Sequence, residues 1–194
     1  MKVMPPNQTA NQSGNQSGNH SANQSGNDRL YLIGIALSLG ALFFLLADTL
    51  TEKLVNQGDQ AAPFKVTASN GKEISLENFG GKVLVLNIWA SWCKPCVDEM
   101  PSLNKFSQLM APEGVVVLGI SIDHDPIKYN KFLKAANITF PNYLDKEAKI
   151  SSSYGTFKVP ETYIIDRSGK VVEKIIGEEV WVNPNVISRI RRLL

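Results

Sequence analysis

The sequence predicts a mixed α/β fold, in which helices cover a sheet built from parallel and antiparallel strands. Two runs of apolar residues, 83–88 and 115–122, have the composition of strands that are buried on both faces. A segment with helical periodicity begins at Cys93, between these runs, and another follows the second run. Strand–helix–strand order of this kind gives parallel strands. A hairpin, with strands 163–166 and 171–176, then adds antiparallel strands.

The helices are predicted from their start signals and from the spacing of their apolar residues. Asp125 and Asn183 are of the residue types that cap helices, and each precedes a proline, which the first turn of a helix tolerates. Apolar side chains recur at three- and four-residue intervals behind each start, which is the pattern of one buried helix face. These positions are Met100, Leu103, Phe106 and Leu109, then Tyr129, Phe132, Leu133 and Ala136, and finally Val186, Ile187, Ile190 and Leu193.

Length and charge limit the classes to which the chain can belong. Its 194 residues are sufficient for one ordinary domain with appendages. The formal net charge is only +2, whereas nucleic-acid-binding domains usually carry a strongly basic face, so no nucleic-acid partner is expected. The two cysteines, Cys93 and Cys96, are too few for a framework of structural disulfides. A four-ligand zinc site is not expected either, because His20 lies in a low-complexity segment and His124 stands alone.

The first part of the chain, residues 1–29, is predicted to be a disordered tail. It repeats a tetrapeptide of the type Asn-Gln-Ser-Gly and contains no large apolar residue between Pro6 and Asp28, so it has nothing to bury. The copies also match the acceptor pattern for N-glycosylation. Such a short pattern arises by chance in any repeat of this composition, and we interpret the segment as low-complexity repetition.

Residues 30–47 are predicted to form a transmembrane anchor. The segment has no charged residue and, as a helix, would span about 27 Å, near the thickness of the hydrocarbon core of a bilayer. A cleaved signal peptide is the alternative, but its leading region would be unusually long and no Ala-x-Ala site follows. A polar linker at 48–60 would lead to a folded domain at 61–194. Basic residues lie on both sides of the segment, so charge does not decide its orientation.

The chemistry of the chain is predicted to reside in the two cysteines. Cys93 and Cys96 would share one helix face and can close a small disulfide ring. The helix N-terminus and Lys94 favour a thiolate at Cys93, which is the species that attacks a disulfide. Trp92 and Pro95 would shape the site, since a proline is tolerated in the first turn. A Cys-x-x-Cys pair alone could be inert or half of a metal site, but its place at a strand-to-helix junction favours redox catalysis. The complete run is Trp89-Ala90-Ser91-Trp92-Cys93-Lys94-Pro95-Cys96.

This run resembles the thioredoxin superfamily and, within it, the membrane-tethered group of the ResA, TlpA and CcmG (DsbE) type. The resemblance extends from Ala61 to the end of the chain. A single anchor followed by one domain of this kind is also the general plan of that group. The other matching segments are Asp98-Glu99-Met100-Pro101 and Val159-Pro160-Glu161-Thr162-Tyr163-Ile164-Ile165-Asp166.

The resemblance implies roles for the cysteines and for one proline. Cys93 is similar to the exposed nucleophile of the group, and Cys96 to its buried resolving thiol. Pro160 is similar to a cis-proline that packs opposite the disulfide, which would leave the backbone of Val159 free to pair with a substrate chain. Without the resemblance, Pro160 would be interpreted as an ordinary proline at the start of a strand.

One departure from ordinary thioredoxin concerns a buried acid. Six residues before the first cysteine, where that family has an aspartate, this chain has Asn87, whose amide cannot take a proton. The tethered group commonly has a glutamate three residues after the second cysteine, here Glu99, on the same helix face as Cys96. A partly buried carboxylate there would raise thiol pKa values and could relay a proton. The alternative is that Glu99 is a solvated surface residue, as we expect of Asp98.

A cluster of ionisable residues, Asp123-His124-Asp125, follows the second buried strand and suggests a metal site. Three adjacent residues rarely converge on one ion, so we interpret this cluster as a solvated loop.

The resemblance implies a thiol:disulfide oxidoreductase on the outer face of a bacterial cytoplasmic membrane. Such a protein would reduce the disulfides of protein substrates, among them apocytochrome c before haem attachment, and a membrane thiol electron donor would restore its dithiol. The Cys93–Cys96 disulfide would serve as the redox group without a bound cofactor. The direction of electron flow depends on the reduction potential and does not follow from the sequence.

Two other functions are compatible with the expected fold. A peroxidase of the peroxiredoxin type shares it, but that chemistry requires a threonine three residues before the reactive cysteine, where this chain has Ala90. A binding module without turnover would use the same cleft to hold a partner, although the intact cysteine pair argues against it.

Overall fold

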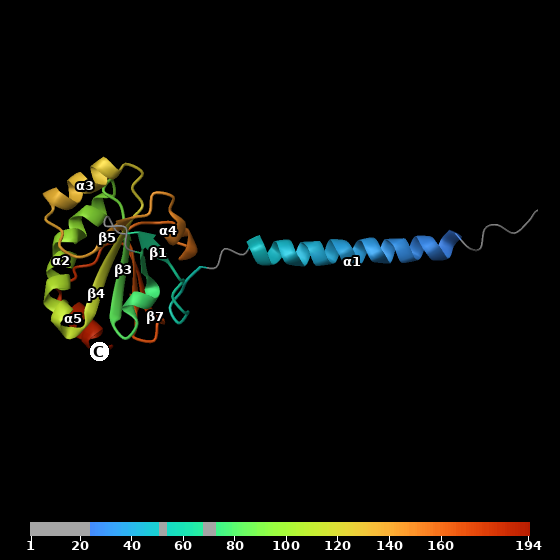
Figure 1. Ribbon diagram of the computed structural model, residues 1–194. Helices are drawn as coiled ribbons and strands as arrows, with labels where there is room; N and C mark the ends of the chain where they lie inside the picture. Colours follow the sequence, from blue (N-terminus) through green and yellow to red (C-terminus); the bar gives the residue numbers. More distant parts are fainter. Residues whose placement is uncertain (1–23, 51–53, 68–72) are drawn as a thin grey trace, which may run out of the picture. The chain divides into compact units, whose positions relative to one another are not determined.

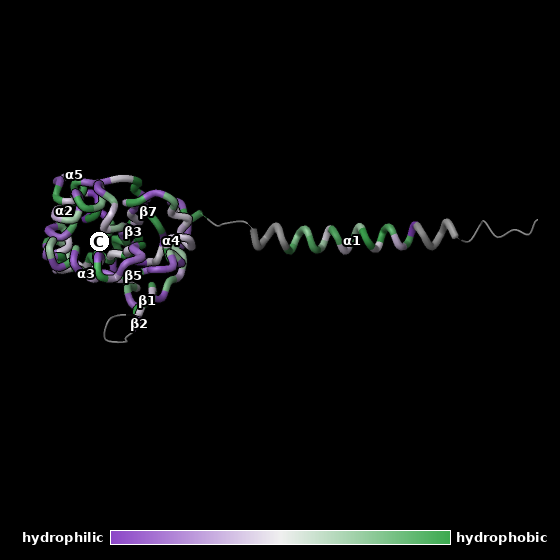
Figure 2. Tube along the Cα trace, turned by 90° about the horizontal axis from the view of Figure 1, so that it is seen from above, coloured by the Kyte–Doolittle hydropathy of each residue, from purple (hydrophilic) through white to green (hydrophobic). Residues whose placement is uncertain are grey.

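The computed structural model describes residues 24–50, 54–67 and 73–194, and the chain divides into two units, Met1–Thr51 and Glu52–Leu194. In the first unit, α1 (Gln24–Leu50) is one continuous helix whose middle part is rich in hydrophobic residues (Figure 2). Most of the predicted tail, residues 1–23, lies outside the described residues, and its last residues belong to α1. Within the part of the chain that is described, no helix combines the length and the apolar character required to cross a membrane.

The second unit is built on a five-stranded mixed sheet with the order β5-β4-β3-β6-β7. Figure 1 shows β3 and β4 side by side in the middle of this unit. The central strand, β3, runs parallel to β4 and antiparallel to β6. All residues of β3 are buried, as expected for a strand that is covered on both faces. The strands of this sheet are β3 (Val83–Trp89), β4 (Val115–Ser121), β5 (Asn142–Leu144), β6 (Glu161–Ile165) and β7 (Val171–Ile176), and a separate pair consists of β1 (Lys65–Thr67) and β2 (Glu73–Ser75).

Helices cover both faces of the five-stranded sheet (Figure 1). One face packs against α2 (Lys94–Met110), α3 (Pro126–Ala135) and α5 (Pro184–Arg191), and the other against α4 (Lys149–Ser153). Short 3-10 turns occupy Leu76–Phe79 and Ala111–Glu113. The core on the α2 side includes Trp89, Met100, Leu103, Phe106, Trp181 and Ile190, and the core on the α4 side includes Leu84, Leu86, Ile88, Tyr154 and Tyr163.

The mixed α/β architecture, the hairpin of β6 and β7, and the starts of the three helices agree with the predictions. The side chains of Asp125 and Asn183 accept hydrogen bonds from backbone N–H groups in the first turns of α3 and α5. The short elements β1, β2, β5 and α4 have no counterpart among the predictions, because three to five residues are too few to establish a periodicity.

The compact unit begins before Ala61, which corrects the linker predicted at 48–60. Val55 is only 4% exposed, and its backbone N–H donates to the carbonyl oxygen of Tyr154 at 3.2 Å. The N–H of Gly58 donates to the carbonyl oxygen of Val171 at 2.8 Å. The second half of the expected linker therefore belongs to the fold, because Val55 fills part of the core on the α4 side.

Strand directions bring three separate segments to one edge of the sheet. The parallel strands β3 and β4 both end there, and β6 begins there, since Ile88 of β3 pairs with Glu161 of β6. The Cys93 loop, the segment that follows β4 and the segment that precedes β6 therefore meet at the carboxyl end of β3. In open α/β sheets this edge is where functional sites usually form.

Candidate active site

Cys93 and Cys96 form a disulfide at the start of α2, with their Cα atoms 5.3 Å apart. Cys93 is the N-cap residue of the helix, and its Sγ accepts the backbone N–H of Cys96 at 3.3 Å. Cys93 retains 7% of its surface, whereas Cys96 is completely buried. Of the two cysteines, Cys93 is therefore the one open to an incoming thiolate, and the helix terminus would stabilise a negative charge on its sulfur.

The residues around the cysteines differ in their relation to solvent. Trp92 is 64% exposed, and Pro95 lies in the first turn of α2, where its missing N–H costs no hydrogen bond. Lys94 points into solvent and forms an ion pair with Asp98, one helical turn further on. The carboxylate of Asp98 raises the pKa of Lys94, because it accepts a hydrogen bond from the ammonium group and carries a negative charge. Because Asp98 offsets the positive charge, Lys94 contributes less to a Cys93 thiolate than its place in the sequence suggests.

A cis peptide bond joins Val159 to Pro160, the geometry that the resemblance implies. Pro160 is buried and Val159 is half-buried. The carbonyl oxygen of Val159 lies 3.5 Å from Sγ of Cys93, although the two residues are far apart in sequence. The segment before β6 therefore faces the disulfide, next to an exposed tryptophan.

Glu99 lies on α2, three residues after Cys96, and is only 3% exposed, so it is not a solvated surface residue. Its Oε1 accepts the side-chain amide of Asn87 at 2.7 Å. Its Oε2 accepts the backbone N–H of Glu179 at 3.1 Å and the indole N–H of Trp181 at 3.4 Å. The amide of Asn87 also donates to the hydroxyl of Thr162 at 2.9 Å, and Thr162 lies two residues after Pro160. A continuous polar network thus extends from α2 across β3 to β6.

Burial raises the pKa of Glu99 to about 7, because desolvation outweighs the three hydrogen bonds that favour the ionised form. Near neutral pH the carboxyl group therefore exists in both states and can accept or release a proton. Asn87 can adapt to each state: its Oδ1 has no hydrogen-bond partner, and rotation of the amide by half a turn would let Oδ1 accept a proton carried on Glu99.

A pH-dependent stability follows from the buried Glu99. Its pKa is about 7 in the folded protein and 4.5 when unperturbed, so between these values the folded state binds more protons than the unfolded state. The free energy of unfolding should therefore fall as the pH rises through this interval, by about 3 kcal/mol. Glu99→Gln should remove this slope, as measured by urea unfolding of the oxidised chain at a series of pH values. Asp98→Asn, a change at an exposed neighbour, should retain it, and parallel curves for wild type and Glu99→Gln would contradict the assignment.

The three ionisable residues after β4 do not form the solvated loop predicted from the sequence. Asp123 is 2% exposed and accepts hydrogen bonds from Ser91 and Ser121. His124 is exposed and contacts the carbonyl oxygen of Lys146, and Asp125 caps α3. The correction concerns Asp123, which turns inward at the end of β4. Among the described residues, no three histidine, cysteine, aspartate or glutamate side chains converge as ligands for a metal ion.

Sequence reasoning missed Thr162, Trp181 and the pair formed by Glu161 and Lys174. Glu161 is 1% exposed and forms an ion pair with Lys174 at 2.6 Å, next to the cis-proline. Strand alternation could have placed Glu161 and Lys174 on neighbouring strands of the hairpin, but no local pattern links Trp181 to Glu99.

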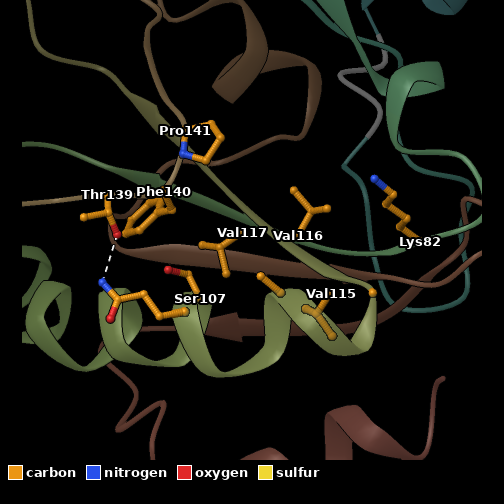
Figure 3. Close-up of a pocket in the computed structure, with 11 residues that line it drawn as sticks. Lys82, Ser107, Val115, Val116, Val117, Thr139, Phe140 and Pro141 are labelled. Carbon is orange, nitrogen blue, oxygen red and sulfur yellow. Dashed lines mark hydrogen bonds between the residues drawn. The ribbon is translucent and has the colours of Figure 1, made fainter.

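Figure 3 shows a pocket lined by residues of α2, β4 and the segment before β5, including Ser107, Val115 and Phe140. It lies at the amino end of β4, away from the disulfide, and belongs to no part of this site.

The residues at this edge of the sheet have the arrangement that thiol–disulfide exchange requires. Cys93 retains some exposed surface, Cys96 is completely buried, and the carboxyl group of Glu99, with a pKa of about 7, lies on the same helix. The protein is therefore a thiol-disulfide oxidoreductase. The model of the AhpC/TSA family matches residues 57–174, and the chain belongs to this family.

Individual relatives agree with this assignment. The thiol-disulfide oxidoreductase ResA of Bacillus cereus is 40% identical over 122 residues, which cover 63% of this chain and 70% of that relative. ResA of Bacillus subtilis is 30% identical over 123 residues, which cover 63% and 69%. Among solved structures, a protein assigned as thiol:disulfide interchange protein DsbE from Chlorobium tepidum has a TM-score of 0.66 at 27% identity, with 72% of this chain and 98% of that chain covered. The chain thus has a thioredoxin-like fold and is similar to oxidoreductases of the ResA and DsbE type.

Proposed function

We propose that this chain reduces disulfides of protein substrates outside the cytoplasm, and that α1 anchors it in the membrane. The observation that carries the redox part is the setting of Cys93. Its sulfur lies at the N-terminus of α2 and 3.5 Å from the carbonyl oxygen of Val159, beside a cis-proline. A substrate chain that pairs with the backbone at Val159 would hold its own disulfide against this sulfur.

In the reducing direction the reaction begins from the dithiol. The thiolate of Cys93 attacks one sulfur of the substrate disulfide, so that a mixed disulfide forms and the leaving thiolate takes up a proton. Cys96 then loses its proton and attacks Sγ of Cys93, which closes the internal disulfide and releases the second substrate thiol. Two electrons pass to the substrate, and a dithiol donor at the membrane must return them.

Glu99 is the group that takes the proton from Cys96 in this proposal. The two side chains lie three residues apart and therefore on the same side of α2. With a pKa of about 7, Glu99 can accept a proton from a thiol without an extreme energetic cost. Asn87 cannot perform this step, and it holds Glu99 in place instead.

The redox proposal is tested by reduction of insulin with dithiothreitol as electron source and by equilibration of the full-length chain in glutathione buffers. We expect catalysed precipitation of insulin chains and a reduction potential more negative than about −200 mV, the side on which reductants such as thioredoxin lie. A potential near that of a strong oxidant, about −120 mV, would reverse the direction of the proposed reaction. Peroxide consumption by the same preparation should be slow, because Ala90 supplies no hydroxyl group; rapid sustained turnover would instead support the peroxidase alternative.

The membrane part of the proposal is supported by the sequence of α1. Residues 30–47 contain no charged side chain, and the hydrophobic residues described there are exposed all around the helix: Leu30, Tyr31, Leu32, Ile33, Ile35, Leu37, Leu39, Leu42, Phe43, Phe44 and Leu45. A helix with apolar side chains on every side needs an apolar environment. We place the folded unit on the outer face of a bacterial cytoplasmic membrane, where protein disulfides are present.

Topology is tested with alkaline phosphatase fused after Leu194, since this enzyme becomes active only outside the cytoplasm. An active fusion in the membrane fraction is the expected result. An inactive but well-expressed fusion would place the domain inside, and an active fusion in the soluble fraction would favour a cleaved signal peptide.

The substrate implied by the resemblance is apocytochrome c, and a disulfide-bonded Cys-x-x-Cys-His peptide is the direct probe for it.

A further inference from the structure

The carboxylate of Asp123 joins the end of β4 to the loop that carries Cys93. Its Oδ2 accepts the backbone N–H of Ser91 at 3.0 Å and the hydroxyl of Ser121 at 2.7 Å. Its Oδ1 accepts the hydroxyl of Ser91 at 2.8 Å. Its own N–H donates to the Ser121 hydroxyl at 3.1 Å. Two of the three hydrogen bonds that the carboxylate accepts are therefore donated by Ser91, which lies two positions before Cys93.

Ser91 lies in the turn that leads from β3 into α2. The N–H of Cys93 donates to the carbonyl oxygen of Ala90 at 3.2 Å, which closes this turn. The preceding carbonyl, that of Trp89, is held by the N–H of Ile122 at 2.9 Å. Ile122 and Asp123, the residues that follow β4, therefore hold the backbone of this turn at Trp89 and Ser91, and Asp123 binds the turn at the residue nearer to Cys93.

The position of this turn matters for reactivity because Cys93 is the N-cap of α2. Its Sγ accepts the N–H of Cys96 only while the backbone of Cys93 keeps its extended conformation at the helix start. A turn that moved freely would lose this bond for part of the time, and with it the stabilisation of the negative charge on sulfur. It would also move Sγ away from its place beside Val159.

We propose that Asp123 is a positioning residue, which clamps Ser91 and thereby holds Cys93 in its reactive place. The proposal rests on disulfide exchange at Cys93 and adds a residue to the machinery for it. Asp123 touches neither sulfur nor substrate, and it acts through two hydrogen bonds to the turn. The clamp explains why a carboxylate is buried at the end of β4, where solvation would otherwise be more favourable.

Asparagine and alanine at position 123 separate hydrogen bonding from charge. In Asp123→Asn the amide oxygen can accept the bonds of Oδ2, and the amide nitrogen can donate to the Ser91 hydroxyl. Asp123→Ala removes all of these bonds. The rate of alkylation of Cys93 by iodoacetamide is measured by mass spectrometry in the reduced full-length chain at neutral pH. We expect Asp123→Ala to lower this rate by about tenfold. Asp123→Asn should remain within about twofold of wild type.

Asp145 provides a matched control for the loss of a buried carboxylate. It is 8% exposed and accepts three backbone N–H bonds at the start of α4, so Asp145→Ala also loses three hydrogen bonds. This variant should lose thermal stability comparable to that lost by Asp123→Ala, yet its Cys93 should react at the wild-type rate. Measurements are made at a temperature at which every variant is folded.

Several outcomes would overturn the proposal. A wild-type alkylation rate in Asp123→Ala would show that the clamp is irrelevant to Cys93, and an equal loss in Asp123→Asn would assign the effect to charge. If Asp123→Ala does not fold, Ser91→Ala replaces it as the test, because this variant removes only the hydrogen bond to Oδ1. Cys93 of Ser91→Ala should be alkylated about threefold more slowly than in wild type. Alkylation at the wild-type rate would overturn the proposal. Alkylation does not depend on substrate, so a chain that fails to reduce insulin refutes the proposed function without affecting this test.

Discussion

Replacement of Cys96 by serine should abolish turnover and leave the chain linked to its substrate. In Cys96→Ser the thiolate of Cys93 can still attack a disulfide at the surface, because Cys93 is the residue of the pair that retains exposed surface. No second sulfur is then available to break the mixed disulfide, and a buried serine hydroxyl is a poor nucleophile toward sulfur. We expect insulin reduction to fall by at least about 10³-fold, while non-reducing gels and mass spectrometry reveal a covalent adduct at Cys93.

Two control variants define this result. Cys93→Ser should be as inactive as Cys96→Ser but should form no adduct, because its remaining sulfur is completely buried. The double variant, Cys93→Ser with Cys96→Ser, should behave in the same way. Adduct formation through Cys96 in the Cys93→Ser chain would show that the two thiols have been assigned in the wrong order. In cells, the adduct of Cys96→Ser would also identify the natural partner.

Loss of Lys174 should destabilise the fold far more than loss of a solvent-exposed charge. Lys174 forms an ion pair with Glu161, and the two side chains are 13% and 1% exposed. Its ammonium group also donates to the carbonyl oxygen of Val55 at 3.3 Å and lies 5.1 Å from the ring centre of Tyr163. Lys174→Met would retain the apolar stem but leave the carboxylate of Glu161 buried without a counter-charge. We expect the free energy of unfolding to fall by about 3–5 kcal/mol in urea titrations.

A double-mutant cycle and an exposed ion pair test this expectation. Addition of Glu161→Gln to Lys174→Met should restore much of the lost stability, because no buried charge is then left without a partner. Arg191 forms an ion pair with Glu113 at distances of 2.8 and 2.6 Å, but this pair is open to solvent. Arg191→Met should therefore lower the free energy of unfolding by less than about 1 kcal/mol. Similar losses for Lys174→Met and Arg191→Met would contradict the view that burial decides the difference.

Local patterns are sufficient to predict the main elements and the reactive pair. Strand β3 can be predicted because the seven consecutive residues Val83–Trp89 are apolar except for Asn87, which is typical of a strand covered on both faces. The start of α2 can be predicted because Cys93 and Pro95 occupy the positions that cap and open a helix. Both features depend on residues close together in the chain, and the chemistry of two cysteines at this spacing depends on little else.

Tertiary structure decides which polar residues are buried and with what partners. Asp98 and Glu99 are neighbouring acids, but only the side chain of Glu99 meets β3 and the segment around Trp181, and only there does desolvation raise its pKa to about 7. The local sequence predicts a solvated Asp123 because it opens a run of three ionisable residues after a buried strand. Its hydrogen-bond partner Ser91 lies 32 residues earlier in the chain.

The sequence by itself therefore determined the fold class and the disulfide, through periodicity and spacing. The pairing of Glu99 with Asn87, of Lys174 with Glu161 and of Asp123 with Ser91 was decided by the assembled sheet. The physical reason is that the free energy of a charged group depends on the water that its surroundings exclude and on the donors that they supply. These surroundings come from segments that are distant in sequence and meet only when the chain is folded.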